Sequence, residues 1–120
     1  MHQKSYILVV ESDDLIRQLL ERWLGEAGYA VVAAASCPAA LERVPCLVIA
    51  NVSSPRNAAE LIRSLQVRHA APILVVSARF RRGLGSSVEV AQRLGVGKVL
   101  PKPFTREELL AAVGESIGGP

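Results

Sequence analysis

The feature that most constrains the fold is a series of short apolar runs in which polar and apolar residues do not alternate. Five such runs occur, the last weaker than the rest, at residues 6–10, 30–34, 46–50, 73–76 and 98–100. A strand with one face in water alternates polar and apolar residues, whereas a strand buried on both faces of a parallel sheet is apolar throughout. The runs therefore predict a five-stranded parallel sheet that is covered on both faces.

Segments with the helical period separate these runs. After the first run, six apolar residues recur at helical spacing and form one stripe: Leu15, Ile16, Leu19, Leu20, Trp23 and Leu24. We expect this stripe to face the core, and the helix to end at Gly28, in the C′ position that favours glycine. The next helix is short and begins near Ser36, with Pro38 in its first turn.

Capping boxes predict the remaining helix starts. In this pattern an N-cap residue precedes a glutamate by three positions. The pairs are Asn57 with Glu60, Ser86 with Glu89 and Thr105 with Glu108. The element order is thus strand then helix, five times, which predicts an α/β fold with right-handed crossovers and helices on both faces of the sheet.

The chain has the length and composition of a single folded domain. It has 120 residues, half of them apolar, and its formal net charge of +3 is a mild excess, so a single core suffices to hold it together. No apolar run approaches the roughly 20 residues of a membrane span, and "MHQKSY" lacks the apolar segment of a signal peptide. We expect a cytoplasmic protein, with a domain at residues 1–117 and a tail or the start of a linker at 118–120.

Polar residues gather at the edge where open α/β sheets bind ligands, beyond the carboxyl ends of the strands. They are Glu11, Ser12 and Asp13 after the first strand, Asn51 after the third, Ser77 after the fourth and Lys102 after the fifth. Carboxylates beside a lysine and a hydroxyl are the makeup of a divalent-cation and phosphoryl site, because they offer oxygen ligands to Mg²⁺ and donors to phosphate oxygens.

Four stretches of the sequence resemble the receiver domain of two-component response regulators: "ILVVESDDLIRQLL", "CLVIANVSSP", "PILVVSA" and "KVLPKPFTREEL". They follow the order of that family and cover nearly the whole chain. The resemblance implies a flavodoxin-like (CheY-like) fold with strand order 2-1-3-4-5. It also implies that a histidine kinase passes a phosphoryl group to an aspartate at the end of the third strand, beside Mg²⁺ held by an acidic pair after the first.

Some positions match what the resemblance implies. Glu11 matches the first member of the acidic pair, and Asp13 matches a third position that is often acidic. Ser77 and Lys102 match the hydroxyl and the ammonium that contact the phosphoryl oxygens in the family.

Other positions depart from the family's pattern. Asn51 occupies the phosphoacceptor position, and an amide is not nucleophilic and cannot form an acyl phosphate. Ser12 replaces the second acid, which in the family is usually a direct Mg²⁺ ligand. Val99 stands where the family's switching aromatic residue lies, and a valine has no ring to swing between buried and exposed positions.

We therefore expect no phosphorylation, no catalytic residue and at most weak Mg²⁺ binding near Glu11 and Asp13. Glu11 is expected to pair with the ammonium group of Lys102 in place of a metal. Two interpretations of Asn51 stay open: a neutral mimic that fixes one state of the domain, or a relic of a lost function. A working receiver that uses Asp13 as a displaced acceptor is an alternative, although Asp13 follows the wrong strand.

A second candidate site is the arginine-bearing segment Arg79, Phe80, Arg81 and Arg82. It either binds an acidic partner, a phosphate or nucleic acid with Phe80 as an anchor, or is a solvated surface loop. Cys37 and Cys46 fit no metal spacing and are expected to be reduced, partly buried thiols. His2 and His69 are expected at the surface.

We expect a degenerate receiver (pseudo-receiver) that is not an enzyme and acts through protein–protein contacts. Its partners would be a histidine kinase, a regulator or an output domain, and we expect neither membrane nor nucleic-acid binding. The family's output face, made by the fourth helix, fifth strand and fifth helix, would include Lys98, Val99 and the helix from Thr105, and a homodimer could form there. The alternatives are a receiver that still binds Mg²⁺ or a phosphoryl group, a basic-loop nucleic-acid module, and a phosphohydrolase, against which Ser12 and Asn51 argue.

Overall fold

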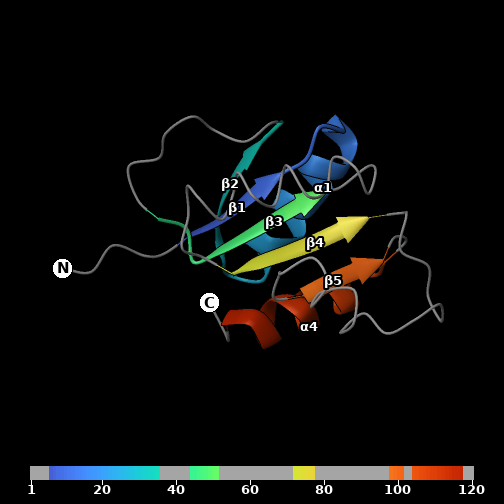
Figure 1. Cartoon of the computed structure of the whole chain (residues 1–120). Helices are drawn as coiled ribbons and strands as arrows, with labels where there is room; N and C mark the ends of the chain where they lie inside the picture. Colours follow the sequence, from blue (N-terminus) through green and yellow to red (C-terminus); the bar gives the residue numbers. More distant parts are fainter. Residues whose placement is uncertain (1–5, 36–43, 52–71, 78–97, 102–103, 118–120) are drawn as a thin grey trace.

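Five strands form one parallel sheet in a computed structural model that describes residues 6–35, 44–51, 72–77, 98–101 and 104–117 (Figure 1). The strands are β1 (Tyr6–Val10), β2 (Ala30–Ala34), β3 (Leu47–Asn51), β4 (Ile73–Ser77) and β5 (Lys98–Pro101). Their order across the sheet is β2-β1-β3-β4-β5. The described helices are α1 (Asp14–Glu26) and α4 (Arg106–Ile117). The predicted strand order and α/β fold are confirmed.

The third strand begins and ends one residue later than the sequence predicted. The Cys46 amide donates a hydrogen bond to the Tyr6 carbonyl at 2.9 Å, but the regular ladder begins at Leu47. At the other end Asn51 pairs with Val76 of β4. Asn51 is therefore the last residue of β3, and its backbone is held on one side by β4.

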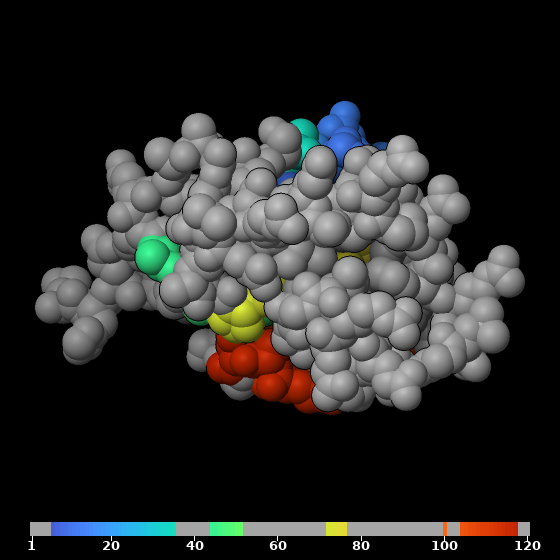
Figure 2. Space-filling view, in the orientation of Figure 1, coloured from blue at the N-terminus to red at the C-terminus, as the bar shows by residue number. Residues whose placement is uncertain are grey.

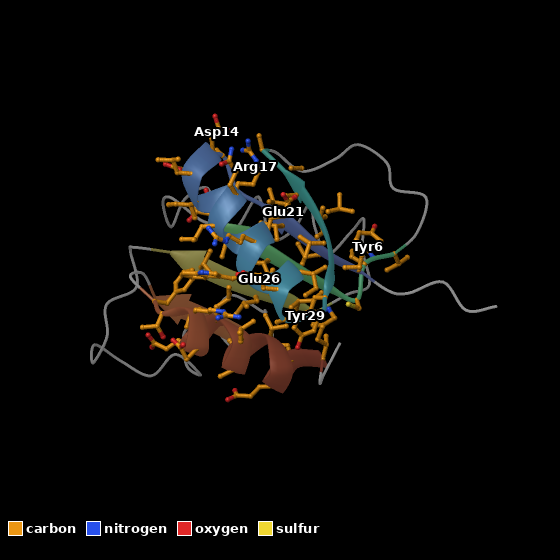
Figure 3. All side chains as sticks on the ribbon, turned by 180° about the vertical axis from the view of Figure 1, so that it is seen from behind. Tyr6, Asp14, Arg17, Glu21, Glu26 and Tyr29 are labelled. Carbon is orange, nitrogen blue, oxygen red and sulfur yellow. The ribbon has the colours of Figure 1, made fainter. Side chains whose placement is uncertain are left out.

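The three central strands are buried on both faces, as the lack of alternation predicts. On one face, residues such as Ile7, Ile49 and Leu74 join a core cluster with buried residues of α1 and α4. Both helices lie on this face, as the view from behind makes clear (Figure 3). On the opposite face, Leu8 and Val48 are fully buried too. The helices predicted at Ser36, Asn57 and Ser86 lie outside the described residues.

The apolar stripe of α1 is narrower than predicted. Leu20 and Leu24 are buried and Ile16 and Trp23 pack against the core, but Leu15 is 78% exposed and Leu19 is 41% exposed. The prediction that all six apolar residues face the core was wrong for Leu15 and Leu19. The helix turns by about 100° per residue, so Leu15 lies about 140° around the axis from Leu20.

The predicted end of α1 is confirmed. Gly28 has a φ of 99°, in the left-handed region that a glycine adopts without steric cost. Its amide donates to the Gly25 carbonyl at 3.1 Å, and the Tyr29 amide donates to the Leu24 carbonyl at 3.1 Å. This pair of bonds is the Schellman motif, which satisfies carbonyls left over at the end of a helix.

The capping box that begins α4 is confirmed as well. The Glu108 amide donates to Thr105 Oγ1 at 3.1 Å, and the Thr105 amide donates to Glu108 Oε1 at 3.0 Å. Just before it, Phe104 meets Trp23 of α1 edge to face, with ring centroids 6.5 Å apart. This aromatic contact joins the two helices on one side of the sheet. Neither described helix is long and apolar enough to cross a membrane.

Candidate functional site

The carboxyl ends of the strands meet at one edge of the sheet, as expected for parallel strands. Val10 of β1 lies opposite Ala50 of β3, so the next residues, Glu11 and Asn51, fall side by side. Asn51 pairs with Val76 of β4, and Ser77 pairs with Pro101 of β5. The structure thus brings Glu11, Asn51 and the backbone of Ser77 to this edge.

Glu11 is bound directly to Asn51. Asn51 Nδ2 donates a hydrogen bond of 2.9 Å to Glu11 Oε2, and only 1% of Glu11 is exposed to solvent. The same Oε2 accepts a hydrogen bond from the Asp13 amide at 3.3 Å. Because a buried carboxylate is costly without hydrogen-bond donors, the amide of Asn51 stabilises Glu11 where it is. The sequence predicts Lys102 as the partner of Glu11, and Lys102 lies outside the described residues.

Asp13 is the N-cap of α1, a role that sequence analysis did not assign to it. Its Oδ1 accepts a hydrogen bond from the Ile16 amide at 3.0 Å, and its backbone is extended, with a φ of −77°. An N-cap carboxylate satisfies one of the amides that have no partner within the helix and interacts favourably with the helix dipole. The preference of aspartate for the position before a helix was the signal that would have identified this role.

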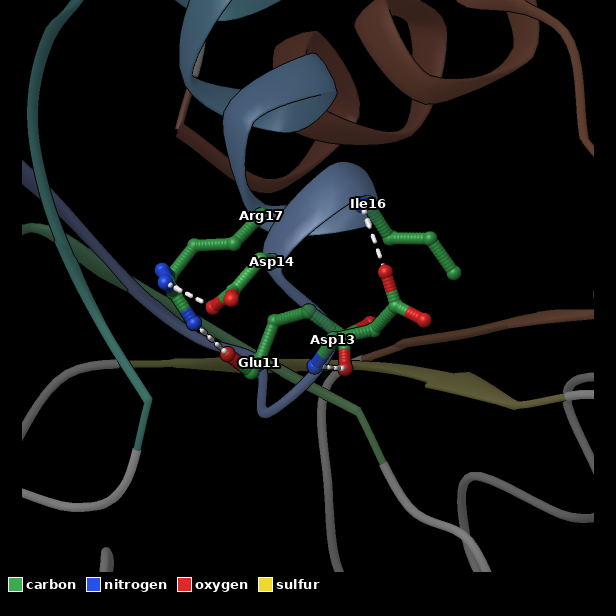
Figure 4. Close-up of polar contacts among 5 residues, drawn as sticks. All are labelled: Glu11, Asp13, Asp14, Ile16 and Arg17. Atoms are coloured by element: carbon green, nitrogen blue, oxygen red, sulfur yellow. Dashed lines mark hydrogen bonds and ion pairs between the residues drawn. The ribbon is translucent and has the colours of Figure 1, made fainter.

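Arg17 holds the backbone of the loop that joins β1 to α1 (Figure 4). Its Nη1 donates to the Glu11 carbonyl oxygen at 3.0 Å, and its Nη2 forms an ion pair with Asp14. Arg17 is largely buried and Asp14 is largely exposed. The spacing of three residues on a helix is typical of such pairs, but nothing in the sequence indicates the contact with the Glu11 carbonyl.

The other predicted site residues contribute less to the described geometry. Ser12, in place of the second acid, is exposed to solvent. Of Ser77 and Val99 the structure describes the backbone, and Val99 pairs with Val75 in the sheet. The segment from Arg79 to Arg82, with Cys37, His2 and His69, lies outside the described residues. Cys46 is free and half-buried, as predicted.

The donor set fits tight Mg²⁺ binding poorly. Mg²⁺ needs several oxygen ligands in near-octahedral geometry. Here Glu11 Oε2 accepts two hydrogen bonds, Asp13 Oδ1 caps a helix, and the Asn51 amide turns a donor toward Glu11. Within the described ranges, no group of three or more His, Cys, Asp or Glu side chains is placed to hold a metal ion. A carboxylate nucleophile is lacking at the end of β3, where Asn51 stands.

Comparison with known proteins finds one family for most of the chain. A model of the response regulator receiver domain matches residues 7–114. The Regulator of RpoS of Escherichia coli K12 is 36% identical over 103 residues, which cover 81% of this chain and 30% of that protein. Response regulator MprA of Mycobacterium sp. strain KMS is 36% identical over 116 residues, which cover 88% of this chain and 47% of that protein. The chain therefore spans less than half the length of these relatives.

Solved structures with the same fold cover nearly the whole chain. A response regulator receiver protein from Burkholderia phymatum superimposes with a TM-score of 0.76 at 26% identity, covering 98% of each chain. The receiver domain of sensor histidine kinase PA1611 from Pseudomonas aeruginosa, crystallised with a magnesium ion in its active site cleft, gives a TM-score of 0.74 at 22% identity. It covers 98% of this chain, and at that identity it supports the fold alone.

Proposed function

The chain belongs to the response regulator receiver domain family, and from that premise we propose that it is a receiver that signals without accepting a phosphoryl group. It acts through contacts with other proteins and stays in one conformation. It is a signalling module and not an enzyme. Because the chain spans less than half the length of the two relatives named above, its partner and output belong to this proposal as well.

The observation that carries the proposal is the hydrogen bond from Asn51 Nδ2 to the buried Glu11 Oε2, at 2.9 Å. In a working receiver the position of Asn51 holds the aspartate that attacks phosphorus. An amide there has no anionic oxygen to attack with. Its nitrogen instead donates to Glu11, so each side chain gives the other a hydrogen-bond partner without a metal.

A second line of support comes from the residues at the two other positions that are acidic in the family. The hydroxyl of Ser12 brings no charge to the site, and the carboxylate of Asp13 caps α1. Weak Mg²⁺ binding near Glu11 and Asp13 is the most that we expect.

Signalling then depends on surfaces that partners can reach. The face built from β5 and α4 is the one on which the family usually acts, and here it includes the backbone positions of Lys98 and Val99. Arg106, Glu107 and Glu115 of α4 are exposed, and α4 reaches the surface along the lower rim of the space-filling view (Figure 2). We propose a histidine kinase, a regulator or an output domain as the partner, with homodimerisation on this face as one arrangement.

The test is an amide NMR titration with Mg²⁺ and then with beryllofluoride, which imitates an aspartyl phosphate. We expect no shifts clustered at Glu11, Asn51, Ser77 and Lys102 in the natural chain. The double variant S12D/N51D restores the two acids and serves as the matched control, because it should respond to both ligands. Incubation with acetyl phosphate and Mg²⁺ completes the test: an acid-labile phosphoprotein formed by the natural chain would refute the proposal.

A further inference from the structure

Strand β2 is an edge of the sheet that stays partly open to solvent. It stands at one end of the strand order, with β1 as its neighbour (Figure 1). All of β1 and most of β3 are buried, whereas none of the five residues of β2 is, and Val32 is 44% exposed. An edge strand offers a row of backbone amides and carbonyls to another strand. The sheet can therefore be extended at β2.

The hydrogen bonds of the loop after β1 show which backbone groups of β2 point outward. The Glu11 amide donates to the Ala34 carbonyl at 2.9 Å, so the polar backbone groups of Ala34 face β1. The amide and carbonyl of one residue lie on the same side of a strand, and successive residues alternate. Those of Val32 therefore face β1 as well, and those of Val31 and Ala33 point away from the sheet.

The sequence of β2 lacks the features that protect an edge strand from pairing. Natural edge strands carry charged residues, particularly lysine, or proline. β2 reads AVVAA, with no charge, no proline and no glycine. The opposite edge, β5, reads KVLP and contains both a lysine and a proline. One edge of this sheet is therefore protected by its sequence and the other is not.

We propose that β2 pairs with β2 of a second copy of the chain and joins the two sheets into one. Hydrogen bonding between parallel strands is not symmetric, so a twofold pair of identical edges is antiparallel. With Val32 on the twofold axis, Val31 of each copy lies opposite Ala33 of the other, and each such pair exchanges both of its N–H···O bonds. This register uses every outward-pointing backbone group of Val31 and Ala33.

The side chains favour the same register. Val31 and Ala33 pack against the core cluster on the side of α1, so Val32, between them, lies on the other face of the sheet. In the dimer the two Val32 side chains form a directly opposed, non-hydrogen-bonded pair, the closest kind of cross-strand contact. The pairing covers the most exposed residue of β2 with its own copy, and no charge on either strand opposes it.

Two other arrangements fit the edges less well. Pairing β2 of one copy with β5 of the next would repeat without closing and form a filament, and Lys98 and Pro101 of β5 disfavour it. An extended segment of another protein would meet the same outward groups. Nothing in β2 selects such a segment, because its five side chains carry no charge and no polar group.

The small size of this interface sets the strength that we expect. The five residues of β2 on each side compare with about 20 to 30 in a standard interface, so we expect a Kd on the order of 0.1 to 1 mM. The inference goes beyond the proposed function and does not depend on whether Asn51 accepts a phosphoryl group. It places self-association at the opposite end of the sheet from the face built from β5 and α4.

The first test is amide hydrogen exchange by NMR on the whole chain, from well below to well above that Kd. The amides of Val31 and Ala33 should exchange more slowly as the concentration rises, because only the dimer gives them the proposed partners. At a total concentration of about three times the Kd, about one third of the chains are monomeric, and exchange should slow about threefold. The Val32 amide faces β1 and is the internal control, with no dependence on concentration.

Cysteine cross-linking tests the register. In a C37A/C46A background, V32C should form a disulfide-linked dimer on mild oxidation, because the Cα atoms of a non-hydrogen-bonded pair lie about 4.5 Å apart, within reach of a disulfide. V44C is the matched control, since Val44 is more exposed than Val32, at 61%, but lies outside β2. We expect V32C to cross-link roughly tenfold faster than V44C, because pairing holds its two thiols together.

A charge at the twofold axis should separate the two copies. V32K places two ammonium groups opposite each other and should weaken the dimer about tenfold in sedimentation equilibrium. V32T keeps the branched side chain without a charge and should change the Kd by less than about threefold. Both variants should keep the amide spectrum of the folded chain, which shows that V32K acts on association and not on folding.

Four results would overturn the inference. They are exchange at Val31 and Ala33 that does not slow with concentration, equal cross-linking of V32C and V44C, a dimer that V32K leaves unchanged, and growth beyond the dimer in sedimentation. The third would place self-association on another face, such as that of β5 and α4, and the fourth would indicate open pairing of edges. A chain that stays monomeric, and whose Val31 and Ala33 amides are protected only by an added extended peptide of alternating threonine and valine, would assign the edge to a partner's strand.

Discussion

Replacing Asn51 by aspartate turns the attraction between residues 11 and 51 at the candidate site into a repulsion. In the natural chain, Nδ2 of Asn51 donates to Oε2 of the buried Glu11 at 2.9 Å. In N51D an oxygen takes the place of that nitrogen and two carboxylates face each other. We expect N51D to unfold more easily than the natural chain in metal-free buffer.

The magnitude follows from two contributions. The lost hydrogen bond to a carboxylate is worth about 1.5 to 3 kcal/mol. Two unit charges at about 3 Å repel by about 1 kcal/mol in bulk water and about 5 kcal/mol at an effective dielectric constant of 20. The side chains can move apart at the open edge of the sheet, which relieves most of the repulsion. We therefore expect the free energy of unfolding to fall by about 3 kcal/mol, a large part of the ~5 to 15 kcal/mol typical of a domain.

The assay is urea unfolding followed by the fluorescence of Trp23, with EDTA present. N51A separates the two contributions, because it removes the hydrogen bond without adding a charge, and should cost about 1.5 to 3 kcal/mol and less than N51D. D14N changes an exposed acid at the start of α1, whose surface ion pair with Arg17 contributes little to stability, and serves as the matched control, with an expected change below about 0.5 kcal/mol. Added Mg²⁺ should restore part of the stability of N51D and none of that of N51A.

A small effect would refute this reasoning. If N51D unfolds within about 0.5 kcal/mol of the natural chain without metal, the Glu11–Asn51 hydrogen bond does not hold the site together. If N51A and N51D are destabilised equally, the charge on the aspartate is not what matters. Either result would remove the physical basis for a site that is stable without a metal ion.

Three further predictions concern the fold, each measured by urea unfolding. T105A removes one half of the capping box of α4 and should cost about 1 kcal/mol, whereas T105S should restore most of it. G28A forces an alanine into a φ of 99° and should cost about 1 to 2 kcal/mol; an equal stability would mean that the turn relaxes. L24A opens a cavity at a fully buried side chain and should cost about 2 to 5 kcal/mol, while L15A, at a side chain that is 78% exposed, should change stability by less than about 0.5 kcal/mol.

The fold could be predicted from the sequence because its signals are local. The strands lack alternation, Gly28 ends α1, and Thr105 with Glu108 begins α4. Each of these signals depends on residues a few positions apart, and each is confirmed for the elements named, except that the edge strand β2 is only partly buried, with Val32 44% exposed. The stripe of α1 was predicted too wide because an apolar residue at helical spacing satisfies the pattern whether or not another element covers it. Leu15 and Leu19 fit the pattern, yet no sequence rule says how far the core extends around a helix.

The candidate site could be located from the sequence but its contacts could not. Parallel strands bring their carboxyl ends to one edge, so the positions of Glu11 and Asn51 followed from the element order alone. Their hydrogen bond joins residues 40 positions apart and depends on the register between β1 and β3. The contact of Arg17 with the Glu11 carbonyl is of the same kind. It depends on the direction in which α1 leaves the sheet.

The contacts at the site bear on the two interpretations of Asn51 that the sequence left open. A relic would be free to lose its hydrogen bonds, and a carboxylate as buried as Glu11 would then be expensive to keep. Instead Glu11 receives donors from Asn51 and from the Asp13 amide, and its own carbonyl receives Arg17. The Asn51 amide turns the positive end of its dipole toward Glu11, at the place where a working receiver would hold a metal ion. Since an amide neither dissociates nor exchanges, we expect the site to stay in one state, as the neutral-mimic interpretation requires and the relic interpretation does not.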